Sequence, residues 1–216
     1  MNNQKENILV AGANGTTGRI IVNLLQKLKD YTPIAMVRKQ EQKDYFDKID
    51  VQTIMADLEE DLNHTVNQID KVIFAAGSGG ANVIKVDQEG AKRLIDAAEQ
   101  NQVKKFVMLG SIGTDDPSQG GDLKDYLKAK QNADKHLRAS TLDYVIVRPG
   151  RLTNKEATGK ITLAEQVDKN GSISRADVAK TLVEVLQDDV KLHQTFEIIA
   201  GDTLIEKAVR LNEISS

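Results

Sequence analysis

The fold is decided by the stretch Ile8-Leu9-Val10-Ala11-Gly12-Ala13-Asn14-Gly15-Thr16-Thr17-Gly18-Arg19. Its first residues form a short apolar run, typical of a strand that is buried on both faces. Apolar residues resume after the last glycine at helical spacing, at Ile20, Ile21, Val22, Leu24, Leu25 and Leu28. A strand, a glycine-rich turn and an amphipathic helix together form the context that a dinucleotide-binding fingerprint requires.

Each glycine of this stretch has a separate physical role in such a turn. Gly12 permits the tight turn off the strand, Gly15 lets the backbone approach a pyrophosphate, and Gly18 lets the helix pack close to the sheet. The free N–H groups and the positive end of the helix dipole would then receive the phosphate charge. The spacing G-x-x-G-x-x-G departs from the commoner G-x-G-x-x-G, and the alternative interpretation is an ordinary glycine turn.

The composition is that of an ordinary globular protein and argues against several functional classes. The 216 residues are 40% hydrophobic and 28% charged, with a net charge of −3. No apolar run approaches the roughly 18 residues of a membrane span, and the polar N-terminus lacks the core of a signal peptide. The absence of cysteine excludes disulfides and thiolate chemistry, and His64, His136 and His193 lack a second ligand at metal spacing. We therefore expect a cytoplasmic protein without a metal site that binds neither membrane nor nucleic acid.

Strand-like and helix-like segments alternate along the whole chain. The expected strands are 8–10, 33–37, 51–55, 72–76, 105–109, 144–147 and 195–199, with a short one at 160–163. The expected helices are the one after Gly18, then 40–48, 60–67, 82–101, 123–139, one starting at Ser174, and 204–211. This alternation predicts one α/β domain over 1–216, a doubly wound Rossmann-type domain with a mostly parallel sheet flanked by helices. A small substrate-side loop region is expected at about 151–172.

Ligands of such sheets bind beyond the carboxyl ends of the strands, where the strand order reverses. The residues that follow the expected strands are therefore candidate ligand-binding positions. They are 12–18, Arg38, Asp57, 76–80, Ser111 and Pro149. Each could singly be an ordinary loop residue, but that interpretation explains their joint placement poorly.

Arg38 follows Gly18 by about 20 positions, where the residue that contacts the adenosine ribose is expected. An acidic residue there would accept hydrogen bonds from a 2′-hydroxyl, whereas an arginine offers a forked cation to a 2′-phosphate. Lys39 adds a second positive charge. We therefore expect NADP(H) to be preferred over NAD(H), the alternative being a solvated basic loop.

Tyr126 and Lys130 lie four residues apart, on one face of an expected helix. A tyrosine phenol exchanges protons poorly at neutral pH unless its anion is stabilised, and a cation one helical turn away supplies that stabilisation. Ser111, at the end of a strand, could orient a substrate carbonyl or hydroxyl. The alternative is an exposed tyrosine beside a solvated lysine.

With these features, the chain resembles the short-chain dehydrogenases/reductases, specifically the atypical branch near the NAD(P)-dependent epimerase-like and NmrA-like proteins. The resemblance covers nearly the whole chain. It rests on 12–19, Val37-Arg38, Asp57-Leu58, 74–77, 86–91, 108–111, Tyr126 with Lys130, 148–150 and 173–179.

The resemblance implies a role for individual residues. Those implied to bind the cofactor are Gly12, Asn14, Gly15, Thr16, Thr17 and Gly18 around the pyrophosphate, Arg38 at the 2′-phosphate, Asp57 and Leu58 at the adenine, Ala75, Ala76 and Gly77 at the adenosine, and Pro149 at the nicotinamide. Ser111, Tyr126 and Lys130 match the catalytic triad of the family. The usual fourth member is an asparagine, and Asp87 occupies its place. An aspartate cannot donate through an amide, so this substitution puts the proton relay in doubt.

These observations favour an NADP(H)-dependent oxidoreductase or epimerase-like enzyme acting on a small carbonyl or hydroxyl substrate. One alternative is an NmrA-like redox sensor that binds NADP(H) without turnover. Another is a flavin or quinone reductase, which needs an open nicotinamide face and no tyrosine acid. Substrate specificity should come from 77–81, 113–122 and 151–172. The sequence indicates neither the substrate nor the oligomeric state.

Overall fold

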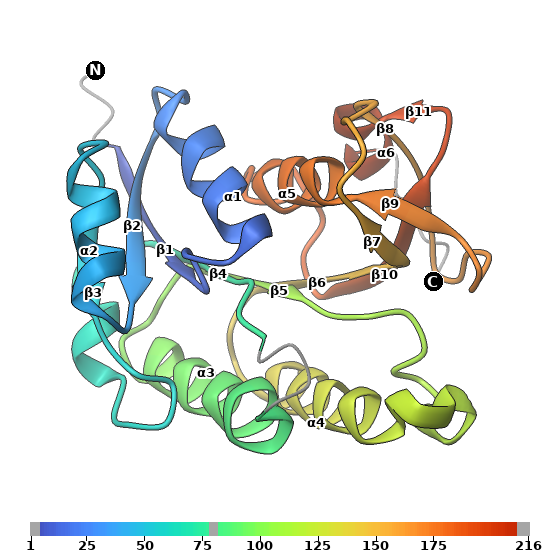
Figure 1. Cartoon of the computed structure of the whole chain (residues 1–216), viewed down its shortest axis with the longest axis horizontal. Helices are drawn as coiled ribbons and strands as arrows, with labels where there is room; N and C mark the ends of the chain where they lie inside the picture. Colours follow the sequence, from blue (N-terminus) through green and yellow to red (C-terminus); the bar gives the residue numbers. More distant parts are fainter. Residues whose placement is uncertain (1–4, 78–81, 211–216) are drawn as a thin grey trace.

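A computed structural model describes residues 5–77 and 82–210 of the chain. The expected turn at 77–80 and the end of the expected helix 204–211 therefore lie partly outside the described residues. Figure 1 shows one sheet across the middle of the molecule with helices on both sides of it. No described helix has the length and apolar character that crossing a bilayer would require.

The main sheet has nine strands in the order β11-β8-β10-β6-β5-β4-β1-β2-β3 within the described residues. They are β1 (Glu6–Ala11), β2 (Tyr31–Val37), β3 (Gln52–Met55), β4 (Lys71–Phe74), β5 (Lys105–Leu109), β6 (Tyr144–Pro149), β8 (Lys160–Ala164), β10 (Gln194–Ala200) and β11 (Thr203–Leu204). All neighbours pair in parallel except β8, which runs antiparallel to β10 and β11. Two further short strands, β7 (Arg151–Thr153) and β9 (Ser172–Ser174), pair with each other. The predicted doubly wound, mostly parallel sheet is confirmed.

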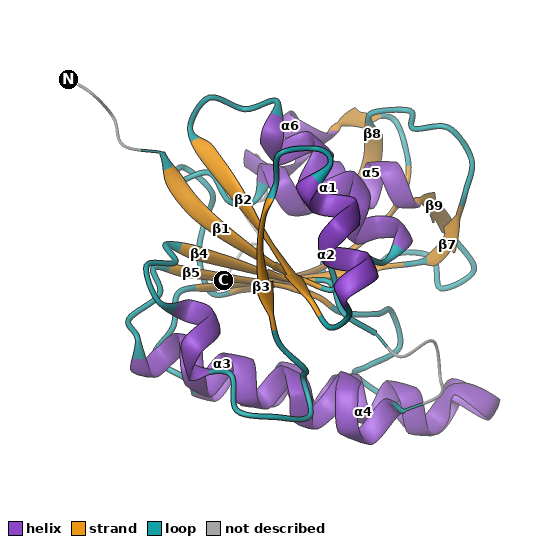
Figure 2. Ribbon diagram, turned by 60° about the vertical axis from the view of Figure 1, so that its left-hand side comes forward, coloured by secondary structure: helices purple, strands orange, loops and turns teal. Residues whose placement is uncertain are grey.

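Helices cover the two faces of the sheet in separate groups (Figure 2). One group is α1 (Thr16–Gln26), α2 (Gln40–Asp47), α5 (Arg175–Glu184) and α6 (Ile205–Arg210); the other is α3 (Ala91–Gln100) and α4 (Lys124–Ala139). The side chains of β1 alternate between the two layers. Ile8 and Val10 pack in the core beneath the first group, and Leu9 and Ala11 in the core above the second. This double burial explains why the strand is apolar without interruption.

Three expected segments differ in detail from the structure. The expected helix 82–101 begins as the π-helix η2 (Val83–Gly90) and continues as α3. The expected helix 60–67 is a short 3₁₀ helix, η1 (Asn63–Val66), and a second one, η3 (Pro117–Leu123), lies in the polar loop before α4. The segment 151–172, expected to be loop with a short strand at 160–163, holds that strand as β8 and, in addition, β7 and the start of β9. The pairing of β7 with β9 orders these two strands, a tertiary contact that local sequence periodicity does not encode.

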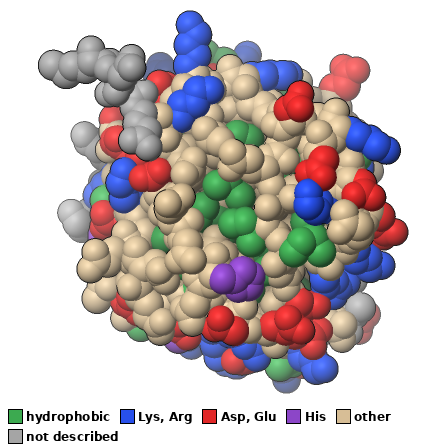
Figure 3. Space-filling model, turned by 90° about the vertical axis from the view of Figure 1, so that its left-hand side faces the viewer, with side chains coloured by type: hydrophobic (Ala, Val, Ile, Leu, Met, Phe, Trp, Pro, Cys, Tyr) green, Lys and Arg blue, Asp and Glu red, His purple; other side chains and the backbone are tan. Residues whose placement is uncertain are grey.

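The face that carries the edge strand β3 and the helix α2 is shown in Figure 3. Lysine and arginine side chains are interspersed there with aspartate and glutamate, and a small group of hydrophobic side chains lies near the centre. The charges on this face therefore do not gather into a patch of one sign.

The start of α5 is held by a buried carboxylate, Asp177, which is 1% exposed. The Ser174 hydroxyl accepts from the Asp177 amide at 3.0 Å and donates to its carboxylate at 2.8 Å. The same carboxylate accepts from the amides of Thr158 and Gly159 at 3.0 and 2.8 Å. The helix cap predicted at Ser174 is confirmed, and it also fastens the segment before β8 to α5.

Replacing Asp177 with alanine should lower the free energy of unfolding by about 2–4 kcal/mol, because the buried Ser174 hydroxyl and the partly buried amides of Thr158 and Gly159 lose their acceptor together. Urea denaturation followed by circular dichroism measures the loss. Asp202→Ala, at an exposed position whose side chain makes no hydrogen bond within the described residues, is the matched control and should change stability by less than about 0.5 kcal/mol. Equal stability of the two variants would contradict the role given to Asp177.

Candidate active site

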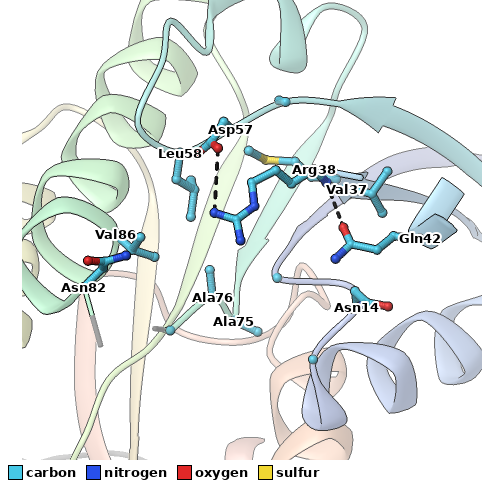
Figure 4. A pocket seen from close by; sticks show the side chains of 15 residues that line it. Asn14, Val37, Arg38, Gln42, Asp57, Leu58, Ala75, Ala76, Asn82 and Val86 are labelled. Atoms are coloured by element: carbon cyan, nitrogen blue, oxygen red, sulfur yellow. Dashed lines mark hydrogen bonds and ion pairs between the residues drawn. The ribbon is translucent and has the colours of Figure 1, made fainter. Parts of the chain in front are cut away.

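A cavity of about 410 Å³ opens at the carboxyl edge of the sheet, between β1 and β4. In the sheet, β2 lies on one side of β1 and β4 on the other. The strand order therefore reverses beside β1, at the position of this cavity. The lining residues are Gly12, Asn14, Gly15, Met36, Val37, Arg38, Gln42, Ala56, Asp57, Leu58, Ala75, Ala76, Gly77, Asn82 and Val86. They come from the ends of β1, β2, β3 and β4, from α2 and from the start of η2, and Figure 4 shows the labelled side chains around the cavity.

At the floor of the cavity, backbone segments contact one another directly, with no side chain between them. Gly12 has a φ of +84°, and a Cβ added there would lie 2.6 Å from the backbone of Ala76. A Cβ on Gly18 would lie 2.1 Å from the Gly12 carbonyl oxygen. Only glycine therefore fits at either position, as the sequence predicted for a tight turn and a close helix.

The first turn of α1 faces this floor with its backbone donors uncapped. Gly15 is the cap residue and supplies no side chain, and no acidic residue lies in the first turn. Thr16, which is exposed, and Thr17, which is buried, are the first two residues of the helix. The positive end of the helix dipole is therefore left for an external anion. Neither threonine nor Gly18 lines the cavity itself.

Asn14 is fixed by Arg19, a residue that the sequence analysis did not select. The Arg19 guanidinium donates to the Asn14 backbone oxygen at 3.2 Å and to its side-chain oxygen at 2.7 Å. The same guanidinium lies 4.0 Å from the centre of the Tyr45 ring, a cation–π distance. These contacts of Arg19 hold the glycine turn in one conformation.

Arg38 extends from the end of β2 along the cavity (Figure 4). Gln42 accepts a hydrogen bond from its backbone amide at 2.9 Å and so fixes the start of α2. The guanidinium lies 3.7 Å from the Asp57 carboxylate, and the Arg38 side chain is 54% exposed. Because this ion pair is long and solvated, the cation can exchange Asp57 for a better anionic partner.

The opposite wall is apolar and comes from Leu58, the segment 75–77 and η2. Asn82, which caps η2, and Val86 within it reach the cavity and were not selected from the sequence. Their positions depend on the wider turns of the π-helix, for which the sequence carries no recognisable signal. Gly90 lies at the other end of η2, where an added Cβ would lie 2.8 Å from Leu58 Cβ. The close approach of η2 to this wall again depends on a missing side chain.

Lys130 is buried beneath the same edge, and its ammonium group is already surrounded by oxygen atoms. It lies 3.4 Å from Asp87 and at 3.4 and 3.5 Å from the carbonyl oxygens of Ala76 and Leu109. Both charged side chains are at most 5% exposed. The ammonium lies 5.9 Å from the centre of the Tyr126 ring. The pair therefore ties α4 to η2 and to the ends of β4 and β5.

Ser111, Tyr126 and Pro149 lie at this edge of the sheet but do not line the cavity described above. The Ser111 hydroxyl donates to the Ile112 carbonyl at 3.2 Å, a weak local bond that a substrate oxygen can replace. Tyr126 is half-buried in the first turn of α4. Pro149 ends β6, and its carbonyl accepts from the Ile112 amide at 3.2 Å.

Comparison with known proteins identifies the same kind of domain. A family model described as NAD(P)H-binding matches residues 12–189. An uncharacterised sugar epimerase of Bacillus subtilis, YhfK, is 36% identical, and the match covers 94% of this chain and 98% of that protein.

Solved structures give the same result at the level of the fold. A Bacillus halodurans protein, provisionally assigned as an NAD-dependent epimerase/dehydratase, is 42% identical with a TM-score of 0.90, covering 94% of this chain and 98% of that one. The oxidoreductase YlbE of Lactococcus lactis is 33% identical with a TM-score of 0.84, covering 94% of both chains.

The glycine turn can be tested with two alanine substitutions that differ in the space available to the new methyl group. Gly18→Ala should destabilise the fold by about 2 kcal/mol or more, because its Cβ would overlap the Gly12 carbonyl at 2.1 Å. Gly15→Ala should destabilise the fold less, since its Cβ would lie 3.3 Å from that oxygen and the carbonyl needs to shift by only a few tenths of an ångström. The latter variant should still bind NADPH more weakly in calorimetry, because the methyl group stands where a pyrophosphate must approach. Full NADPH affinity in Gly15→Ala would show that no phosphate lies against this turn.

Proposed function

Because the chain belongs to the NAD(P)H-binding family, with oxidoreductase-like and epimerase-like relatives, we propose that it is an NADP(H)-dependent oxidoreductase acting on a small carbonyl or hydroxyl substrate. The observation that carries the proposal is the position of Arg38. Its solvated guanidinium lies along the cavity at the strand-order reversal, beside a glycine turn and an uncapped helix start. A phosphorylated adenosine fits these features together.

The residues of the cavity match the parts of a dinucleotide. The Gly12–Gly18 turn and the amides of Thr16 and Thr17 would hold the pyrophosphate, because the backbone is bare and the helix end is uncapped. Leu58 and the backbone at 75–77 offer a largely apolar wall to the adenine and its ribose. An arginine at the ribose position favours a 2′-phosphate, with which it forms bidentate hydrogen bonds.

The chemistry at the other end of the cofactor would use the groups at the ends of β5 and β6. When bound, the nicotinamide supplies a hydride to a substrate carbon or accepts one from it. Ser111 would donate a hydrogen bond to the substrate oxygen and orient it, keeping its own proton. Tyr126 would give its phenolic proton to that oxygen during reduction, and take a proton from the substrate hydroxyl during oxidation.

The Lys130–Asp87 pair supports a second candidate function. In the reductase proposal Lys130 assists Tyr126, yet its ammonium is engaged by a buried carboxylate and two carbonyls. A protein that binds NADP(H) as a redox sensor would need this pair only to hold α4 in place. Incubation with NADPH and a panel of carbonyl, quinone and flavin acceptors separates the alternatives, because a sensor binds the cofactor and oxidises none of it.

Tyr126→Phe should lower kcat for carbonyl reduction by about 10²–10⁴-fold, because the phenolic proton is lost while the ring remains. The dissociation constant for NADPH should be nearly unchanged, since Tyr126 does not line the adenosine cavity. Stopped-flow absorbance of NADPH and calorimetry measure the two quantities. Undiminished turnover would remove Tyr126 from the mechanism and leave a direct flavin or quinone reductase as the better proposal.

Arg38→Ala should weaken NADPH binding by about 10–100-fold, equivalent to the loss of a charge-assisted pair, and leave NADH binding nearly unchanged. Asp57→Asn should act in the opposite direction and strengthen NADPH binding a few-fold, because Arg38 loses its competing carboxylate at 3.7 Å. The ratio of the two dissociation constants is the measured quantity, since a contact of Asp57 with the adenine would affect both cofactors alike. Equal losses for NADPH and NADH in Arg38→Ala would show that Arg38 does not contact the phosphate.

A further inference from the structure

A second cavity, of about 290 Å³, lies between the loop after β5, the start of α4 and the segment 166–169. Its walls come from two of the segments expected to determine substrate specificity, 113–122 and 151–172. Two glycines keep it open. A Cβ on Gly113 or Gly120 would lie 3.3 or 2.5 Å from the Leu127 side chain, which forms one wall.

This second cavity adjoins the groups proposed to act on substrate. Ile112 lines it, directly follows Ser111, and is bound through its amide to the Pro149 carbonyl at 3.2 Å. Leu127 lines it and directly follows Tyr126. Ser111 and Tyr126 are thus each followed in the chain by a residue that lines this cavity.

The most buried charge in the lining is Glu197 of β10, which is 4% exposed. The Val167 amide donates to one of its carboxylate oxygens at 3.0 Å. That is its only hydrogen bond in the described part of the chain, so the carboxylate keeps capacity for a further partner. A buried carboxylate facing a cavity is costly unless a cation or strong donor meets it there.

The neighbouring arginine is engaged elsewhere. Arg148 is the β6 partner of Glu197 in the strand register, but its guanidinium binds Asp134 at 2.9 and 3.1 Å and Asp115 at 2.7 Å. Burial raises the pKa of Asp134, and the Arg148 charge opposes that rise and holds the pair together. Arg148 is thus already matched by two carboxylates.

The lining consequently carries an excess of negative charge. Asp115, Asp116 and Glu197 contribute carboxylates, and Lys169 contributes the one ammonium group of the lining. Lys169 is exposed at the rim, whereas Glu197 lies at the buried end. The excess of carboxylates and the burial of Glu197 together favour a cation that enters the cavity from the rim and binds the Glu197 carboxylate.

We propose that this cavity is the substrate subsite and that it selects substrates bearing a positive charge, an ammonium or a protonated nitrogen heterocycle, with Glu197 as the specificity-determining residue. The assignment rests on the proposed oxidoreductase function for the reacting end of the substrate. The binding of the cation depends only on the cavity.

Binding is tested first without any turnover. Benzyltrimethylammonium, which cannot be reduced, should bind the NADPH-loaded protein in calorimetry, and its uncharged isostere neopentylbenzene should bind at least about 10-fold more weakly. Glu197→Gln keeps an oxygen acceptor for the Val167 amide and should abolish the difference. Lys169→Gln, at the exposed rim, should strengthen binding of the cation. Glu165→Gln, an equal change of charge on an exposed residue outside the lining, is the control and should leave binding unchanged.

Turnover then compares isosteric aldehydes, 4-formyl-N,N,N-trimethylanilinium and 4-tert-butylbenzaldehyde, by kcat/KM. We expect the cationic aldehyde to be preferred about 10-fold, Glu197→Gln to remove the preference and Lys169→Gln to enlarge it. Equal kcat/KM for both aldehydes would overturn the subsite and leave the oxidoreductase proposal standing. Binding of benzyltrimethylammonium that requires Glu197, without turnover of either aldehyde, would support the subsite and count against the oxidoreductase.

Discussion

The structure depends on the close approach of three backbone segments, the end of β1, the start of α1 and the end of β4. Gly12 and Gly18 permit this approach, because a single methyl group at either position would overlap neighbouring backbone. The same bare surface that allows the packing also exposes amide groups to an anion. Folding and cofactor binding are thus consequences of one steric constraint.

A second constraint operates beneath the adjacent strands. The buried pair of Asp87 and Lys130 joins η2 to α4, and a buried ion pair needs both partners because each alone would be an uncompensated charge. The carbonyl oxygens of Ala76 and Leu109 hold the same ammonium group at 3.4 and 3.5 Å, so the pair also fastens α4 to the ends of β4 and β5.

The sequence was sufficient for the parts of the molecule that local chemistry determines. The apolar run of β1, the glycine turn and the Ser174 cap could all be read from neighbouring residues, and the predicted sheet followed from the alternation of such segments along the chain. The contributions of Asn82 and Val86 to the cavity could not, because they depend on a π-helix stabilised by tertiary packing. The ion pair of Arg38 with Asp57 and the burial of Glu197 were equally invisible, since each joins residues from separate strands or loops.

The two cavities are built from separate stretches of the chain. The one beside Arg38 uses segments up to residue 86, whereas the one beside Glu197 uses segments from residue 112 onward. Mutations that reshape one need not disturb the other. Under the proposed function, a lineage with this architecture can acquire new substrates while it retains its cofactor, and a laboratory library confined to 112–120 and 166–169 would vary specificity without altering the residues around the cofactor.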